Sequence, residues 1–186
     1  PQKKTSLIIL SGKAMSNTFL SRNYLNGGDA IIIEKGVFHF TKVLSDNGLF
    51  MFEIESPPLK TDLLRLEDRY GRETLGYEGI TEMQTQNLDN YGYFNFNESD
   101  RYEKYTHASD KFIATFEVFP NDEEFQKYFK ITENGLYTSC KGKLLDNENN
   151  VLLNTADTQK SDTLSSIKEI HITEKTILLK TITKDK

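Results

Sequence analysis

The chain of 186 residues is 37% hydrophobic, 27% charged and 11% aromatic, a composition that excludes a disordered protein and predicts a buried core. The formal net charge of −5 argues against nucleic acid as a partner, because binding to phosphates needs clustered Lys and Arg. The apolar runs, such as 7–10 and 30–33, are far shorter than the roughly 20 residues of a membrane-spanning helix, so no membrane span is expected.

The length predicts one β-rich domain over residues 1–186. Charge is spread unevenly within it, since residues 1–28 hold four bases and no acid, whereas residues 53–124 hold 17 acids against seven bases. Because opposite charges steer association, the basic segment 1–28 is expected to dock on an acidic neighbour, within the chain or on another copy. A solvated acidic surface explains the charges of 53–124 equally well.

Segments of alternating or continuous apolar residues predict about ten strands. The clearest is a hairpin over 37–55, in which aromatic residues alternate with other side chains on both arms. The other predicted strands cover 7–15, 30–34, 73–85, 91–97, 112–119, 136–145, 151–154, 167–173 and 177–183, the last two forming a closing hairpin. So many antiparallel strands are typically closed or stacked, which predicts a mostly β fold, either an antiparallel barrel or a two-sheet sandwich, with one or two short helices.

Polar turns that end in glycine separate these strands. Glycine supplies the positive φ that such turns require, and Asp or Ser at the first position caps them. The four turns lie at 45–48, 68–71, 89–92 and 132–135. Each is expected to join two strands of a hairpin.

Two helices are predicted from capping patterns. Asn121 precedes three acidic residues and an apolar stripe over 125–129, which indicates a helix N-terminus. A second helix is predicted over 56–71, although 64–66 fits a strand equally well. Residues 155–166 are polar and are predicted to form a long exposed loop.

Cys140 is the single cysteine, which excludes an intrachain disulfide and fits a reducing compartment. Its alternating position predicts a packed strand residue and not a nucleophile. His39, His107 and His171 are isolated from one another in the sequence, so no metal or cofactor is expected. No nucleotide-binding or hydrolase motif occurs either, and the chain is therefore not expected to be an enzyme.

The densest aromatic region lies at 91–105, where acidic companions again disfavour nucleic acid. Tyrosine is enriched at recognition surfaces, so these rings are candidates for a protein interface together with the N-terminal bases. The interface candidates are Lys3, Lys4, Lys13, Arg22, Tyr91, Tyr93, Tyr102 and Tyr105.

These patterns predict a noncatalytic interaction or assembly module that binds protein partners or itself, such as a structural subunit of a viral or phage particle. The alternative is a β-barrel with lipocalin-type architecture that binds a small apolar ligand and is exported or derived from a lipoprotein. A carboxylate-based hydrolase is a third alternative, because 28 Asp and Glu residues ensure that some acids lie close together. The first residues show no signal-peptide pattern, so cytoplasmic synthesis without export, or a place in a virion, is expected.

Overall fold

The computed structural model describes residues 2–57, 59, 62–66, 99–131 and 134–184. These residues form fourteen strands and two short helices, and every strand pair among them is antiparallel. The predicted mostly β fold is therefore confirmed, and the described strands form open, packed sheets without a closed barrel. The predicted strands at 73–85 and 91–97, and the turns at 68–71 and 89–92, lie outside the described residues.

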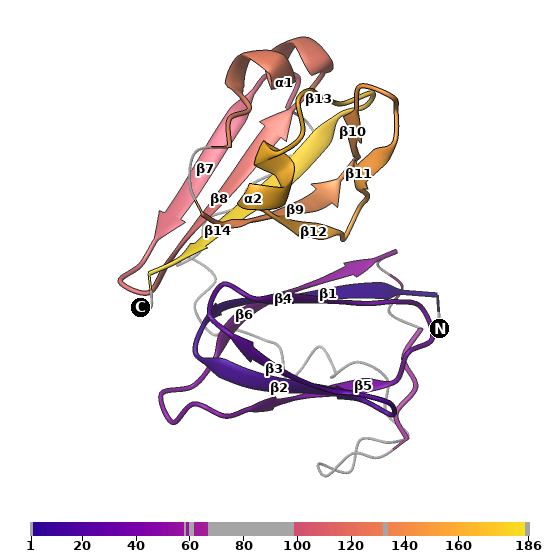
Figure 1. Ribbon diagram of the computed structural model, residues 1–186, viewed down its shortest axis with the longest axis vertical. Helices are drawn as coiled ribbons and strands as arrows, with labels where there is room; N and C mark the ends of the chain where they lie inside the picture. Colours follow the sequence, from indigo (N-terminus) through magenta and orange to yellow (C-terminus); the bar gives the residue numbers. More distant parts are fainter. Residues whose placement is uncertain (1, 58, 60–61, 67–98, 132–133, 185–186) are drawn as a thin grey trace, which may run out of the picture.

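Four sheets are described (Figure 1). The central sheet has the order β4 (Ala30–Ile33), β1 (Lys4–Ser11), β6 (Phe50–Ser56). The outer sheet has the order β3 (Arg22–Asn26), β2 (Lys13–Thr18), β5 (His39–Val43). The large sheet has the order β12 (Thr158–Lys160), β9 (Leu136–Lys141), β14 (Thr176–Thr183), β8 (Phe112–Phe119), β7 (Glu103–Ala108). The small sheet has the order β11 (Val151–Leu153), β10 (Leu144–Asp146), β13 (Ile170–His171).

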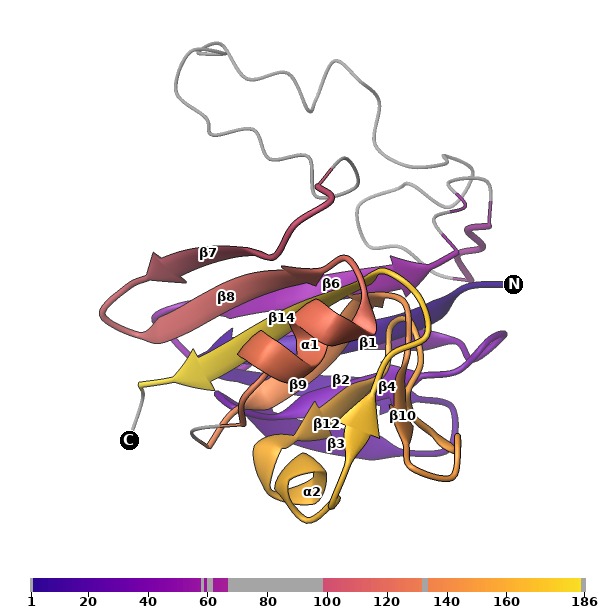
Figure 2. The same ribbon diagram turned by 90° about the horizontal axis from the view of Figure 1, so that it is seen from above.

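The outer, central and large sheets are stacked as three layers (Figure 1). The helices α1 (Asp122–Tyr128) and α2 (Ser161–Ser165) lie beyond the large sheet, on the side away from the central sheet. Figure 2 shows the same stack from above, with the large sheet between the helices and the central sheet. None of the helices in the described part of the chain is long and apolar enough to cross a membrane.

Strand β1 is buried on both faces, because it is the middle strand of the middle layer. Ile9 packs with Ala14 on the side of the outer sheet, whereas Ile8 and Leu10 pack on the side of the large sheet. A continuous apolar run such as 7–10 is typical of a strand that is covered on both faces.

The chain passes between the central and outer sheets at glycine corners. β1 continues into β2 through Gly12, which has φ +94°, and β5 continues into β6 through a turn that ends at Gly48, which has φ +84°. As a result β5 pairs with β2, whereas β6 pairs with β1. The predicted hairpin over 37–55 is therefore wrong. The polar turn at 45–48 exists, but it joins two sheets instead of two neighbouring strands.

The predicted closing hairpin over 167–182 is also wrong. β13 pairs with β10 of the small sheet, whereas β14 pairs with β8 and β9 in the centre of the large sheet. Strands were expected over 167–173 and 177–183, and β13 lies within the first of these ranges while β14 covers the second. Their pairing partners are distant in the sequence, and the alternation of residues along one strand does not specify its partner.

Helix α1 confirms the prediction made from its cap. The Asn121 side-chain oxygen accepts a hydrogen bond from the backbone N–H of Glu124 at 3.0 Å, and Phe125 is buried beneath the helix. No helix is described within 56–71, because Ser56 ends β6 and residues 62–66 form no regular element. The rest of that segment, apart from residues 57 and 59, lies outside the described residues.

The prediction of an exposed loop at 155–166 is wrong, because this segment contains β12 and α2. The Thr158 hydroxyl lies 2.9 Å from the Ser6 hydroxyl and 2.8 Å from the Thr138 hydroxyl, so it joins the central and large sheets. Leu164 of α2 is buried in the main apolar cluster. The hydroxyl groups of Thr158, Ser6 and Thr138 form hydrogen bonds with one another inside the protein. The low hydrophobicity of 155–166 therefore did not show that part of the segment is buried.

Candidate functional site

Two carboxylates of β6 face the space between the central and outer sheets. Met51 lies opposite Ile9 and packs with it toward the outer sheet. Because side chains alternate along a strand, Glu53 and Glu55 lie on the same face as Met51. The central sheet therefore presents two acids to the sheet opposite.

A histidine of β5 faces the same space from the outer sheet. Val43 lies opposite Ala14, which packs toward the central sheet, and His39 lies four residues before Val43 on the same face. Lys3, next to the start of β1, completes the group through an ion pair with Glu55. We define the intersheet site as Lys3, His39, Glu53 and Glu55.

Lys3 and Glu55 fix one side of this site. The Lys3 Nζ and Glu55 Oε1 atoms are 2.8 Å apart, and their side chains are 7% and 29% exposed. The backbone N–H of Lys3 also donates a hydrogen bond to Asp62 Oδ2 at 2.9 Å, which holds the lysine backbone in place. A charge-assisted contact of this length orients both side chains.

Glu53 is protonated more readily than an ordinary glutamate, because part of its surroundings is buried even though the residue, like His39, is exposed overall. Burial raises the pKa of Glu53 above its ordinary value, and the negative charge of Glu55 raises it further, while His39 and Lys3 act in the opposite direction. Two neighbouring carboxyl groups thus have different environments, one ion-paired and one partly desolvated. Glu53 therefore takes up a proton at a higher pH than an ordinary glutamate does.

The ring of His39 is oriented by its own loop. Its Nδ1 atom lies 3.1 Å from the carbonyl oxygen of Val37. A carbonyl can only accept, so in the neutral ring Nδ1 carries the proton and Nε2 presents a lone pair. The Val37 contact therefore leaves Nε2 as the ring nitrogen that faces away from the loop carbonyl.

Ser16 adds an unused polar group to the same interior face. It lies two residues from Ala14 on β2 and is fully buried. Its Oγ atom has no hydrogen-bond partner in the described part of the chain. Buried polar atoms nearly always have a partner, so this hydroxyl is an exception on the interior face.

Together these groups suit hydrogen bonding to a small polar molecule. The carboxyl groups of Glu53 and Glu55 and the ring of His39 offer hydrogen-bonding atoms, and Lys3 pairs with Glu55. Among the residues that the structure describes, no group of three or more His, Cys, Asp and Glu is placed to hold a metal ion.

A polar depression of about 390 Å³ lies beside the small sheet, away from the intersheet site. It is lined by Gln126, Asn147, Asn149, Glu169, Ile170 and His171. The Gln126 amide donates to the Ile170 carbonyl at 2.8 Å, and His171 Nε2 lies 3.2 Å from Asn149 Oδ1. Two pairs of lining residues therefore already bond one another.

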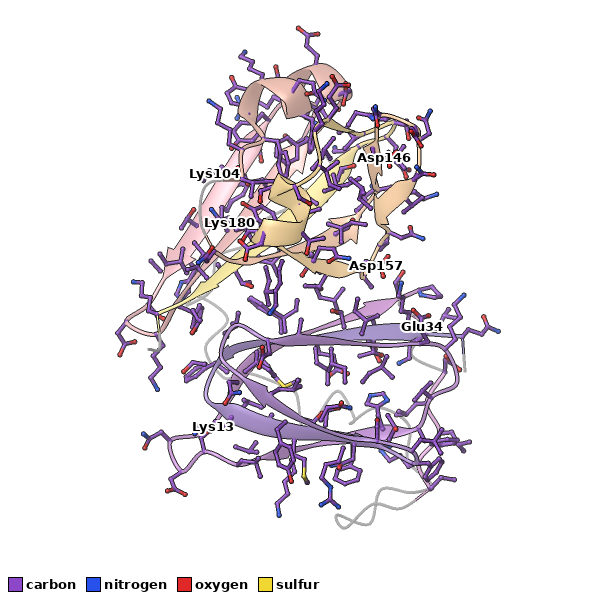
Figure 3. All side chains as sticks on the ribbon, viewed as in Figure 1. Lys13, Glu34, Lys104, Asp146, Asp157 and Lys180 are labelled. Atoms are coloured by element: carbon purple, nitrogen blue, oxygen red, sulfur yellow. The ribbon has the colours of Figure 1, made fainter. Side chains whose placement is uncertain are left out.

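The adjoining loop is held by Asp146, which is labelled in Figure 3. Its carboxylate accepts hydrogen bonds from the backbone N–H groups of Glu148 and Asn150 and from the Asn150 side chain. The Asn150 contacts lower the pKa of Asp146 more than its partial burial raises it. Asp146 therefore closes a turn between β10 and β11.

The structure directs Lys3 and Lys4 into the protein. Lys3 lies in the intersheet site. Lys4 forms an ion pair with Asp157, and its Nζ atom also lies 3.7 Å from Glu34 Oε1. Both lysines thus bind acids of their own chain, and Figure 3 labels Glu34 and Asp157 on the facing sides of the central and large sheets.

The remaining interface candidates are scattered. Lys13 and Arg22 lie on the outer sheet. Tyr102 donates to Glu117 Oε1 at 2.8 Å and stacks on Tyr128 at 4.1 Å, and burial followed by the Glu117 contact raises the pKa of Tyr102.

Tyr105 donates to Glu103 on the same strand. Tyr91 and Tyr93 lie outside the described residues. An interface role for Lys13, Arg22, Tyr102 and Tyr105 stays a prediction.

Sequence reasoning missed the intersheet site. Glu53 and Glu55 fell within one arm of the predicted hairpin without a role of their own, and His39 was treated as an isolated histidine. The available signal was alternation, which places residues 51, 53 and 55 on one face. It could not show that this face meets a second sheet.

Cys140 is packed beside the cluster between the central and large sheets, as predicted for a strand cysteine. Burial raises the pKa of the thiol to about 12. Because the thiolate is the reactive form, we expect the folded protein at pH 8 to react with iodoacetamide at least tenfold more slowly than the urea-unfolded chain. Equal labelling rates, measured by mass spectrometry, would contradict this placement.

The comparisons with known proteins add little to this geometry. No protein-family model matches the sequence, and no curated protein matches it. A solved structure described as a "Cupin 2 conserved barrel domain protein" from Leptotrichia buccalis matches over 97% of this chain and 74% of its own, at 12% identity and a TM-score of 0.32. A likeness at that score carries no argument about function.

The expected function is corrected here. An assembly module that docks on another copy through Lys3 and Lys4 is wrong, because both lysines bind acids of their own chain, the other outcome that the charge pattern allowed, and β1 is the central strand of the fold. The alternative, an apolar-ligand barrel, is wrong because the described sheets are open and the space between two of them carries charged groups.

Proposed function

We propose that the intersheet site binds a small polar molecule that offers both hydrogen-bond donors and acceptors. The observation that carries this proposal is the meeting of Glu53 and Glu55 with His39 across two facing sheets. The buried and unpartnered hydroxyl of Ser16 on the same interior face supports it.

The charges of the site favour a polar ligand over an apolar one. An apolar group would remove water from the Lys3–Glu55 pair without replacing its hydrogen bonds, which is costly. A hydroxyl, amide or carboxylic acid group would instead accept from Glu53 and donate to His39 or Glu55. We propose recognition without turnover, so that the chain is not an enzyme.

The first test follows the protonation of Glu53. The folded-state pKa of Glu53 is raised, so the native protein binds more protons than the unfolded chain above pH 4.5, the ordinary value. The stabilising effect of protonated Glu53 is fully present below pH 4.5 and is lost as the pH rises through the folded-state pKa. We therefore expect the wild type to lose stability relative to Glu53→Gln between pH 4.5 and neutrality, measured by urea unfolding at several pH values.

The matched control is Glu174→Gln, since Glu174 is exposed on a turn away from the site. Its stability is expected to run parallel to that of the wild type across the same pH range. Parallel curves for Glu53→Gln as well would show that Glu53 is not tuned by the site.

The second test measures ligand binding directly. Glycerol, glucose, glycine and malonate are screened by NMR at pH 5 and pH 8, with backbone amides as reporters. At least one probe is expected to shift signals of Ser16, His39 and Glu53 together, and to lose about tenfold in affinity in Glu53→Gln, because one good hydrogen bond to a charged or buried group is worth that much. Shifts confined to other surfaces, or an unchanged affinity in the variant, would refute the proposal.

A further inference from the structure

The outer sheet turns one face away from the central and large sheets (Figure 1). Residues directly opposite one another on neighbouring strands share a face, so the register identifies which side chains lie there. Tyr24, Met15 and Lys42 form one row across β3, β2 and β5. Arg22, Asn17 and Phe40 form the next row. We define these six residues as the outer platform.

Two aromatic rings of the outer platform are open to solvent. Tyr24 is 63% exposed and Phe40 is 60% exposed. They lie on the two edge strands and in neighbouring rows, which puts their backbones about 12 Å apart from standard strand spacings. Exposed rings gathered on one face mark a recognition surface more often than chance exposure does.

The outer platform is also basic. Arg22 and Lys42 belong to it, and Lys13, labelled in Figure 3, lies on the same face of β2. The outward positions of β3, β2 and β5 hold no acid. Lys42 forms no ion pair with any residue that the structure describes. In a protein with a net charge of −5, this face is complementary to an anion.

An unused donor lies beneath these side chains. Asn17 is only 6% exposed, and its Oδ1 atom accepts a hydrogen bond from Arg22 Nε at 3.2 Å. Its Nδ2 atom is buried and has no partner in the described part of the chain. A buried donor without a partner is costly, so it indicates a place where a ligand oxygen completes the bond.

We propose that the outer platform binds an acidic oligosaccharide. A sugar carboxylate would accept from the Arg22 guanidinium and the Asn17 amide, which their mutual hydrogen bond holds side by side. The apolar faces of two sugar rings along the chain would lie on Phe40 and Tyr24. Lys42 would receive a second carboxylate.

Nucleic acid fits this surface less well. Stacked bases follow one another at about 3.4 Å, whereas the backbones that carry the two rings lie about 12 Å apart, so neighbouring stacked bases would not reach both. A ligand whose rings are spaced further apart than stacked bases, such as a chain of sugar rings, fits the separation of Tyr24 and Phe40 better.

The test compares matched ligands by isothermal titration calorimetry on the full chain. The probes are a hyaluronan hexasaccharide, which carries carboxylates, and cellohexaose, which is neutral. We expect hyaluronan to bind at least tenfold more tightly than cellohexaose, with an affinity that falls as salt rises. Tyr24→Ala, Phe40→Ala and Arg22→Ala are each expected to weaken hyaluronan binding about tenfold or more.

Two control variants leave the platform intact, Lys143→Ala and Glu53→Gln. Both are expected to bind hyaluronan like the wild type, and the second separates this site from the intersheet site. Circular dichroism is used to confirm that the platform variants fold, which their exposed positions favour.

Three results would each overturn the proposal. They are no binding of hyaluronan, equal affinity for cellohexaose, and unchanged affinity in the platform variants. Tighter binding of oligo(dT) or of phosphatidylserine vesicles than of hyaluronan would assign the face to another class of partner and would overturn it too.

Discussion

Gly12→Ala is expected to lower the free energy of unfolding by roughly 3 kcal/mol. Gly12 has φ +94°, a conformation that residues with a side chain rarely adopt. A Cβ atom there would also lie 2.5 Å from the Gly48 carbonyl oxygen and 2.8 Å from Ser45 Oγ. The backbone of one corner between the central and outer sheets would have to move away from the other. Urea unfolding, followed by circular dichroism, measures the loss.

Gly48→Ala is the matched control. Gly48 has φ +84°, but a Cβ atom there would meet nothing within 4 Å. It should therefore show only the backbone penalty of about 1 to 2 kcal/mol. If the two substitutions cost the same, the close approach of the two corners does not matter for stability.

Phe119→Ala is expected to cost about 3 to 5 kcal/mol, the range for removing a fully buried aromatic ring. Phe119 has no exposed surface and lies in the middle of an aromatic cluster beneath α1. Its ring centroid is 5.1 Å from that of Phe125, 5.5 Å from Tyr102 and 6.1 Å from Phe129. These three rings come from α1 and from the segments that flank it and β7, so the cavity could not be filled without moving several elements.

The control for this prediction is Phe40→Ala, because the Phe40 ring is 60% exposed. A change within about 0.5 kcal/mol is expected there. Phe119→Leu should fall between the two, since leucine refills much of the volume. Thermal unfolding that shows equal losses for Phe119→Ala and Phe40→Ala would mean that Phe119 is not a core residue.

Local elements could be predicted from the sequence because their causes are local. Phe112–Phe119 appears as β8 with the expected bounds, since branched and aromatic residues fill it. The helix after Asn121 was marked by its cap, whose hydrogen bond is formed within four residues. Alternation and capping depend only on residues close in the sequence, so they were sufficient to predict β8 and α1.

Strand partners could not be predicted, because they depend on distant residues. The two arms of the expected hairpin at 37–55 do form strands. They do not pair with each other, because the chain changes sheets at Gly12 and near Gly48. One arm, β6, pairs with β1, and the other, β5, pairs with β2. The intersheet site depends on the same pairing. Glu53 and His39 face one another only because their strands lie in opposite sheets.

The double burial of β1 has a consequence for how this protein is made. β1 pairs with β4 and β6, which follow soon after it, but its other face is covered by the large sheet, whose middle strand β14 is the last in the described chain. During synthesis the apolar face of Ile8 and Leu10 stays uncovered until β14 leaves the ribosome. Contacts between such distant segments slow folding and lengthen the time during which this face can bind other unfinished chains. A chaperone that shields β1 at that stage would raise the yield of folded protein.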